Sequence, residues 1–527
     1  MTTGTWPLIR LILRRERFRI GIWSVGLVAM VAISAESVKG FYPTQESLEA
    51  GAESARNPAV LAFQGPDQAL DTIGGRTALE IGAPGLVFMG LMALLMTGRM
   101  TRAEEEAGRF ELVRALPVAH QAPLLAAGSV VAAMSVAIGG VISISLVALD
   151  LPVAGSVNYG LGWTMVGLVF AAITMLTAQV TENSRLANGL AGCALGASFA
   201  LRAVGDMSEG PLAILSWLSP IGWAQGALPF AGERWWPLAL GFAVAAGIAV
   251  LAFRTSERRD LGGGLVAPRP GPATGSERLA SPFALAVRLQ RGALVGWTAG
   301  TAFLALVYGA ITNAVEDFVD DSPEIAEFLQ AIGGNLIDSY VATAARITAL
   351  IGTGFAVQSI LRIRSEETND RTEPILATPV SRRTYWTSHL AFTAIGTVVV
   401  LGVSGLVLGV AAAISVGDAS LVWGGLTAMA TYFPAVLVLV GISATLIGLV
   451  PHRSALSWVA LAAAFLVAMF GTLLDLPSWA MRISPYENLT RVPAEAVGVF
   501  PTVTLLVIAG LLLGAGFAGY LRRDLPA

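Results

Sequence analysis

Charged residues are scarce in this sequence. Of the 527 residues, 13% are charged and 55% are hydrophobic, and the mean hydropathy is +0.69. A soluble domain carries about 25% charged residues, so the composition excludes an ordinary soluble protein. Crossing the roughly 30 Å hydrocarbon core of a bilayer takes about 20 apolar residues, and roughly a dozen stretches meet that length. The sequence therefore predicts an all-α polytopic membrane protein with about 12 transmembrane helices.

Residues that commonly build reactive sites are also rare. A single cysteine, Cys193, excludes an intrachain disulfide framework and a Cys-based metal site. None of His120, His389 and His452 belongs to a metal-binding motif, so we expect no metal site and no catalytic residues. The one lysine, Lys39, is not preceded by the glycines of a Walker A loop, so this chain has no such ATP site. We expect no cofactor in this chain and no nucleic-acid partner.

The distribution of basic residues sets the predicted orientation. If the N-terminus is cytoplasmic, most of the 33 Lys and Arg residues fall in cytoplasmic segments, as the positive-inside rule requires. We therefore expect a multi-pass protein of the bacterial plasma membrane with both termini in the cytoplasm. The predicted spans are approximately 20–38, 81–98, 122–149, 158–180, 187–204, 236–253, 292–313, 341–361, 388–414, 421–450, 456–474 and 501–520.

Two charged islands stand out from this apolar background. Residues 102–118 read RAEEEAGRFELVRALPV, and residues 364–380 read RSEETNDRTEPILATPV. At the fixed offset of 262 positions, about half of the residues are identical. The matched pairs are Arg102/Arg364, Glu104/Glu366, Glu105/Glu367, Arg109/Arg371, Glu111/Glu373, Ala115/Ala377, Pro117/Pro379 and Val118/Val380.

The repeat extends beyond the islands to the whole chain. RRERFRIGIWSVG (14–26) resembles RLQRGALVGWTAG (288–300), and a Ser-Pro pair precedes the last span of each half. An even number of spans per half gives both halves the same orientation, related by a pseudo-twofold axis along the membrane normal. We predict a first six-span half (1–255), a Gly/Pro/Arg-rich cytoplasmic linker (256–280) and a second six-span half (281–527).

Each half also begins with a basic amphipathic segment, WPLIRLILRRERFR or SPFALAVRLQRGAL. Such a helix lies at the interface, with arginines toward lipid headgroups. Membrane lipid is therefore an expected partner.

The islands have two interpretations. They are either solvated loops without a special role or short charged helices that transmit force from a soluble partner. On one helix, Glu104, Glu105, Arg109 and Glu111 fall largely on one face, and Pro117 redirects the chain before the next span. Carboxylates on such a face suit an Arg- or Lys-bearing groove on a partner.

The motif Arg-x-Glu-x(5)-Pro-Val after the second span resembles the coupling-helix region of ABC-2 type transporter permeases. The outer-loop stretch NPAVLAFQGPDQALDTIGG (57–75) resembles a signature of actinobacterial permeases that export polyketide antibiotics and other drugs, with two fused six-span halves. The second island departs from the pattern at Thr368, Asn369 and Asp370, where a glycine-containing run is expected, and at Pro374. This departure puts equal engagement of two ATPase subunits in doubt.

The resemblance implies a type V ABC exporter fold and two copies of a separate ATPase subunit, which would bind ATP and Mg²⁺. It assigns ATPase coupling to the island residues Glu104, Glu105, Arg109, Glu111, Glu366, Glu367, Arg371 and Glu373. The second and fifth spans of each half would surround a pathway for a hydrophobic small-molecule substrate. The pathway candidates, for which ordinary helix or lipid packing is the alternative, are Phe88, Met89, Met92, Phe199, Phe355, Phe465, Met469 and Phe470. Arg346 has two interpretations, a snorkelling or paired structural residue or a lining residue of the exit path.

Other functions remain open at this point. The cargo is a drug or antibiotic, or alternatively a lipid or glycolipid, since a hydrophobic pathway accepts either. An ion-coupled secondary transporter also has twelve spans in two halves, but it generally needs ionisable residues well inside its spans, and this chain offers few. A membrane enzyme is disfavoured by the lack of a metal or nucleophile motif.

Overall fold

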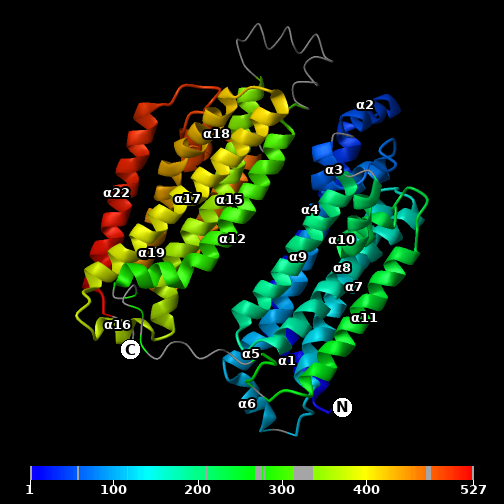
Figure 1. Cartoon of the computed structure of the whole chain (residues 1–527), viewed down its shortest axis with the longest axis horizontal. Coiled ribbons are helices and arrows are strands. Elements are labelled where there is room, and N and C mark those ends of the chain that lie inside the picture. Colours follow the sequence, from blue (N-terminus) through cyan, green and yellow to red (C-terminus); the bar gives the residue numbers. More distant parts are fainter. Residues whose placement is uncertain are drawn as a thin grey trace. The chain divides into compact units, whose positions relative to one another are not determined.

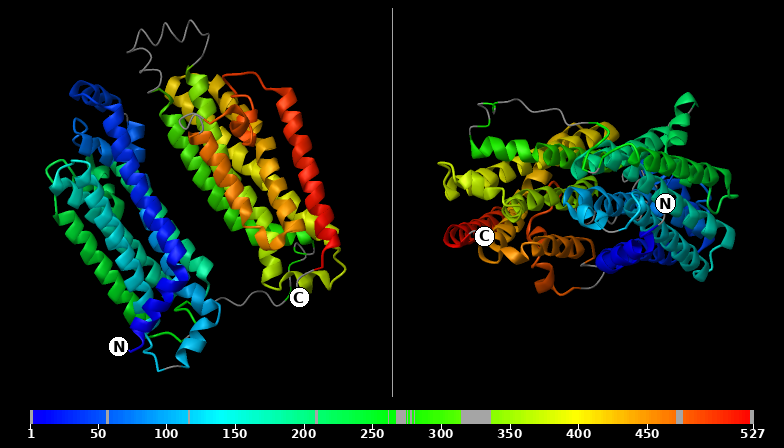
Figure 2. Two further views of the ribbon diagram at one scale, coloured as in Figure 1. Left: turned by 180° about the vertical axis from the view of Figure 1, so that it is seen from behind. Right: turned by 90° about the horizontal axis from the view of Figure 1, so that it is seen from below.

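The computed structural model describes residues 3–55, 58–115, 117–207, 210–260, 262–266, 274, 276, 279, 281–313, 336–470 and 476–524. The chain forms two compact units, unit 1 (Met1–Gly271) and unit 2 (Pro272–Ala527). Every regular element in the described residues is a helix, and within each unit the long helices run side by side (Figures 1 and 2).

Unit 1 alternates long apolar helices with short ones at their ends. Its elements are α1 (Thr5–Phe41), α2 (Gln45–Ala55), α3 (Pro58–Gln64), α4 (Ile73–Met100), α5 (Arg102–Glu106), α6 (Arg109–Arg114), α7 (Ala122–Ala148), α8 (Val153–Val180), α9 (Ser184–Met207), the 3-10 helix η1 (Gly210–Leu218), α10 (Pro220–Gly226) and α11 (Trp236–Ser256). The short helices α5 and α6 lie at one end of the unit, and α2 and α3 lie at the opposite end (Figure 1).

Unit 2 repeats this plan. Its elements are α12 (Pro282–Ala310), α15 (Leu336–Thr368), α16 (Thr372–Leu376), α17 (Arg382–Val416), α18 (Ser420–Thr431), α19 (Phe433–Leu449), η3 (Pro451–Arg453), α20 (Leu456–Phe470), α21 (Ser478–Met481), η4 (Pro485–Asn488) and α22 (Val499–Arg522).

Eleven helices in the described residues are long and apolar enough to cross a membrane. They correspond to eleven of the twelve predicted spans, and α18 with α19 forms one of them. The remaining predicted span, 456–474, corresponds to the shorter α20, and its last residues lie outside the described part of the chain. The basic segment at the start of each half does not form a separate helix, because it is continuous with the first long helix of its unit, α1 or α12.

Local sequence explains where several helices begin. The side chain of Thr72 accepts a hydrogen bond from the N–H of Gly75 at 3.0 Å and caps α4. Ser281 and Ser381 cap α12 and α17 in the same way. A capping oxygen satisfies one of the backbone donors that the first helical turn leaves free, which favours the start of a helix at these residues.

Close helix packing depends on small residues. A Cβ at Gly139 in α7 would lie 2.3 Å from the carbonyl oxygen of Gly160 in α8, and a Cβ at Gly160 would lie 2.2 Å from that of Gly139. A Cβ at Gly448 in α19 would lie 2.1 Å from the carbonyl oxygen of Gly516 in α22. Small residues at helix interfaces let backbones approach in membranes, where burial of apolar surface provides no net drive for association.

Candidate functional site

The first island folds into two short helices, α5 and α6, rather than one. Gly108 separates them with a φ of +72°, a left-handed conformation that glycine adopts without steric cost. The expected single charged face therefore does not form, because Glu104 and Glu105 lie in α5 whereas Arg109 and Glu111 lie in α6.

The second island makes a turn at the matched position. Its two glutamates, Glu366 and Glu367, end the long helix α15, and the short helix α16 follows. Asp370, 262 residues after Gly108, has a φ of +54°. Aspartate is among the few residues that tolerate this backbone region. Where the second island lacks the expected glycine, aspartate keeps the same backbone turn.

Glu104 is buried and held by two arginines. Two nitrogens of the Arg109 guanidinium donate hydrogen bonds to the Glu104 carboxylate, both at 2.8 Å. Arg15 in α1 donates a third hydrogen bond to the same carboxylate, at 2.7 Å. The hydrogen bonds and charge of Glu104 raise the pKa of Arg109, which stays protonated. The Arg109 side chain remains 55% exposed. Glu104 therefore anchors the island inside unit 1, and Arg109 is accessible to solvent.

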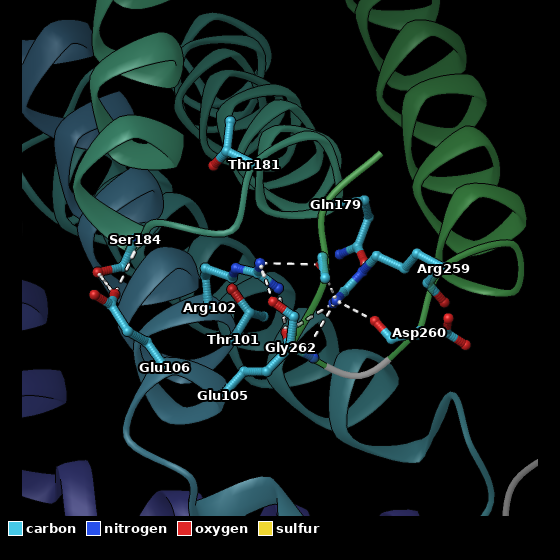
Figure 3. Close-up of polar contacts among 12 residues, drawn as sticks. Thr101, Arg102, Glu105, Glu106, Gln179, Thr181, Ser184, Arg259, Asp260 and Gly262 are labelled. Carbon is cyan, nitrogen blue, oxygen red and sulfur yellow. Dashed lines mark hydrogen bonds and ion pairs between the residues drawn. The ribbon is translucent and has the colours of Figure 1, made fainter. Parts of the chain in front are cut away.

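Glu105 is also buried, and it ties the island to the segment after α11. Arg259 donates to both of its carboxylate oxygens, at 2.6 and 2.7 Å (Figure 3). The backbone N–H of Gly262 donates to Glu105 at 2.8 Å, and Arg102 forms an ion pair with it at 2.8 Å. Arg259 also donates to Gln179 at 2.6 Å, so the contacts of Glu105 connect α5, α8 and the start of the linker.

Further contacts fix the same end of unit 1. Glu106 accepts a hydrogen bond from the backbone N–H of Ser184 at 3.1 Å, which joins α5 to the start of α9 (Figure 3). Glu16, fully buried in α1, forms ion pairs with Arg19 at 2.7 Å and with Arg99 at 3.1 Å. Two long helices thus meet beside the island through a buried carboxylate that the sequence did not single out.

The second island uses a related but different set of partners. Glu367 forms ion pairs with Arg364, at 3.2 Å, and with Arg523, which follows α22. Glu366 pairs with Arg362, whereas Arg371 lies 4.0 Å from it and is 59% exposed. Since Arg109 makes two bonds of 2.8 Å to Glu104, the two islands differ most at this arginine.

The accessible residues of the islands are a subset of those predicted. Glu111 and Glu373 are exposed, as are Arg109 and Arg371. The four other predicted residues, Glu104, Glu105, Glu366 and Glu367, are buried and paired within their own units. A soluble partner can therefore contact the first group directly, and the second group can act only by holding the islands in place.

Arg259 and Arg523 occupy equivalent places that we did not predict. Each follows the last long helix of its unit and pairs with the second buried glutamate of its island. The sequence contains a signal for this: both arginines lie in the tetrapeptide RRDL, at 258–261 and 522–525. The repeat was missed because the first copy lies in a segment interpreted as linker.

The pathway candidates lie in several environments. Met89, Met92 and Phe199 are buried in the core of unit 1, and Phe88, beside Met89, is exposed on its surface. In unit 2, Phe355 is buried against Phe392, with ring centroids 6.3 Å apart. Phe465 is partly buried and packs against the core of unit 2. The structure does not describe the side chains of Met469 and Phe470. The three pockets described in unit 1 are lined by other residues, so the role of these candidates in a pathway stays a prediction.

Arg346 is paired. It donates to Glu487 at 2.8 Å, and both side chains are largely buried. This contact within unit 2 supports the interpretation of Arg346 as a paired structural residue. The described residues contain no group of three or more His, Cys, Asp or Glu side chains that could hold a metal ion.

Comparison with known proteins gives the family of the chain. Residues 279–521 match the family model for the C-terminal domain of the multidrug efflux system permease Rv1217c. Over 532 aligned residues, the chain is 35% identical to the multidrug efflux system permease protein Rv1217c of Mycobacterium tuberculosis strain H37Rv. That alignment covers 99% of this chain and 95% of the M. tuberculosis protein. The eleven apolar helices, the repeated islands and this likeness along almost the whole length lead to one conclusion: the chain belongs to the family of multidrug efflux system permeases typified by Rv1217c.

Proposed function

We propose that this chain is the membrane-spanning permease of an ATP-driven ABC exporter of the ABC-2 type. It moves hydrophobic or amphiphilic compounds, including drugs and antibiotics, out of the cell. ATP and Mg²⁺ bind to two copies of a separate ATPase subunit, because this chain has no Walker A sequence. The relative's name, a multidrug efflux system permease, supports the choice of cargo over a lipid or glycolipid.

The observation that carries this proposal is the construction of the islands. In each unit, two neighbouring glutamates are buried in ion pairs, and a charged arginine and glutamate follow a left-handed turn and face solvent. Buried ion pairs hold each island against the long helices of its unit, so a force on the exposed face reaches the spans instead of bending a loose loop. Solvated loops without a role would not need eight arginines to pair with four carboxylates.

In the proposed cycle, each ATPase subunit contacts one island through its Arg-x-Glu face. Arg109 and Glu111 supply that face in unit 1, and Arg371 and Glu373 supply it in unit 2. In each motif one residue separates the positive arginine from the negative glutamate. This arrangement suits a partner surface that carries an acidic and a basic side chain next to each other. ATP binding and hydrolysis move the islands, and α5 passes the movement to α4 and α9 through the backbone and through Glu106.

The first experiment is purification of the tagged chain from its native membrane in mild detergent, followed by mass spectrometry and an ATPase assay of the eluate. We expect a partner of about 30 kDa or more, the size of one ATPase domain, with a Walker A sequence. Elution of the chain alone, without ATPase activity, would contradict the proposal and favour the secondary transporter.

A further inference from the structure

A second candidate site lies at the end of unit 1 opposite the island. A pocket of about 40 Å³, open to solvent, is bounded by the residues before and at the start of α4, by α8 and by α10. One wall comes from Gly65, Pro66, Gln68 and Gly75, which belong to the outer-loop stretch that the family resemblance singled out. The proposed coupling function does not use this stretch.

Three polar atoms in this pocket have no hydrogen-bond partner. They are the hydroxyl of Tyr159, the indole N–H of Trp163 and the amide oxygen of Gln225. Tyr159 is 7% exposed and Trp163 is 0% exposed. Tyr159 and Trp163 lie one helical turn apart in α8 and pack edge to face, with ring centroids 6.1 Å apart. Leaving a buried polar group unsatisfied costs about 1 to 3 kcal/mol, so an occupant that forms hydrogen bonds with these atoms would bind favourably.

The orientation of Gln225 is fixed by its other end. Its amide nitrogen donates to the backbone carbonyl of Gln64 at 2.6 Å, and only an N–H can face that oxygen. The amide oxygen is therefore directed elsewhere and is available as an acceptor at the pocket. The Trp163 N–H is available only as a donor. An occupant must consequently both donate and accept hydrogen bonds.

The pocket wall also depends on glycines that no other residue can replace. Gly82 interrupts α4 with a φ of +39°, and a Cβ there would lie 2.0 Å from the carbonyl oxygen of Gln64. A Cβ at Gly75 would lie 2.1 Å from the carbonyl oxygen of Ala69. The backbone of the segment before α4 thus packs directly against the backbone of α4. This close packing positions the segment as one wall of the pocket.

No charged side chain lines the pocket. An ionised group placed there would lose hydration without gaining a counter-ion, which is unfavourable. A hydroxyl both donates and accepts, and apolar residues such as Leu79 and Leu86 line the rest of the wall. We propose that this pocket binds the hydroxyl-bearing end of a neutral amphiphile, either a compound in transit or a membrane lipid.

The test compares three photoreactive probes with the same 16-carbon chain and the same diazirine: an alcohol, a carboxylic acid and a primary amine. The intact chain is embedded in phospholipid nanodiscs, irradiated with each probe and mapped by mass spectrometry. Labelling of the peptides containing 65–86, 159–163 and 220–229 is measured relative to the apolar helix α22. We expect preferential labelling of these peptides by the alcohol alone.

Two conservative variants remove the proposed contacts. Tyr159→Phe and Gln225→Leu should each lower labelling by the alcohol about threefold to tenfold, the equivalent of one lost hydrogen bond. Tyr308→Phe, in unit 2, is the control and should leave labelling unchanged. Equal labelling by all three probes, or labelling that neither variant reduces, would overturn the proposal and leave water as the occupant.

Two further arms identify the source of the amphiphile. Competition by monogalactosyl diacylglycerol in the nanodisc identifies a lipid. A loss of cellular tolerance to chloramphenicol, a neutral diol, but not to cationic ethidium in the two variants identifies a transported compound. Only this second arm rests on the proposed export function; the labelling needs no ATPase, so the two proposals can fail separately.

Discussion

Arg259 makes a two-pronged ion pair with Glu105, across 154 residues of sequence, with N–O distances of 2.6 and 2.7 Å. The Glu105 side chain is 3% exposed, so this is a buried pair and not a surface one. Parallel guanidinium–carboxylate bonds fix orientation as well as distance. The end of α11 and the island are therefore held in a defined relation to each other.

Replacement of this arginine should destabilise unit 1. In Arg259→Gln, Glu105 keeps its charge but loses two of its hydrogen bonds. Removing one partner of a buried pair costs about 3 to 5 kcal/mol because the other charge stays buried. We expect a lower unfolding temperature for the purified chain and weaker stimulation of the proposed ATPase partner. Arg258→Gln, an exposed neighbour of the same type, is the control and should change neither.

A double variant distinguishes the loss of the ion pair from other effects of the two substitutions on stability. If the pair itself is responsible, Arg259→Gln combined with Glu105→Gln should be less destabilised than the sum of the two single variants. Strict additivity in the same thermal unfolding assay would show that the two side chains act independently.

The left-handed turn of the islands gives a second prediction. Gly108→Ala places a Cβ on a backbone with φ of +72°, which costs about 1 kcal/mol or more. There is open space around that Cβ, so only the backbone conformation opposes the change. Gly140→Ala, with equally open space in the helix α7, should be neutral or slightly stabilising. Asp370→Gly should be tolerated. Equal unfolding temperatures for Gly108→Ala and Gly140→Ala would contradict this account.

Replacing an exposed glutamate of the first island should weaken partner binding, whereas replacing a buried one should lower the stability of the permease. Glu111→Ala removes an exposed carboxylate, so the permease should keep its stability within about 0.5 kcal/mol but bind the ATPase partner more weakly. Glu104→Ala leaves Arg15 and Arg109 without their shared carboxylate and should lower stability first. Co-purification yield and unfolding temperature, measured on both variants, separate the two effects. If Glu111→Ala retains full partner binding and export, the exposed face is not the contact.

The pocket wall gives a fourth prediction. Gly82→Ala combines a positive φ with a 2.0 Å clash against the backbone of Gln64, so it should either unfold unit 1 or displace the segment before α4. Gly192→Ala, where the nearest atom of Leu94 lies 4.0 Å away, should have no such effect. Hydrogen exchange of the peptides covering 60–80 is the measurement. Unchanged protection of these peptides in Gly82→Ala would argue against the tight packing described.

The sequence predicted the helical spans and the position of both islands, since long apolar runs and a repeated charge pattern are local signals. It could not predict which island residues are accessible. Glu104 and Glu105 were expected at a partner surface because, on a single helix, they share a face with Arg109 and Glu111. Their burial depends on arginines from α1 and from the segment after α11, and such pairings arise only when distant helices pack.

Sequence comparison also overstated one difference between the halves. The absence of glycine in the second island suggested a different local structure, but Asp370 keeps the turn of Gly108. The inequality lies instead in a distance, 4.0 Å from Arg371 to Glu366 against 2.8 Å from Arg109 to Glu104. This difference arises from where the side chains lie. It cannot be predicted from the sequence, because the residues at the matched positions are identical.

The contacts of Arg259 have a consequence for where the chain can be divided between its two units. After Arg259, the N–H groups of Leu265 and Val266 bond to the backbone at Gln179 and Val180, so this stretch belongs structurally to unit 1. The first copy of the repeated RRDL therefore lies at the start of a stretch that is bonded to unit 1. A gene divided after codon 266 would leave each half with its own anchoring arginine, whereas a division before codon 259 would transfer the first half's arginine to the wrong polypeptide.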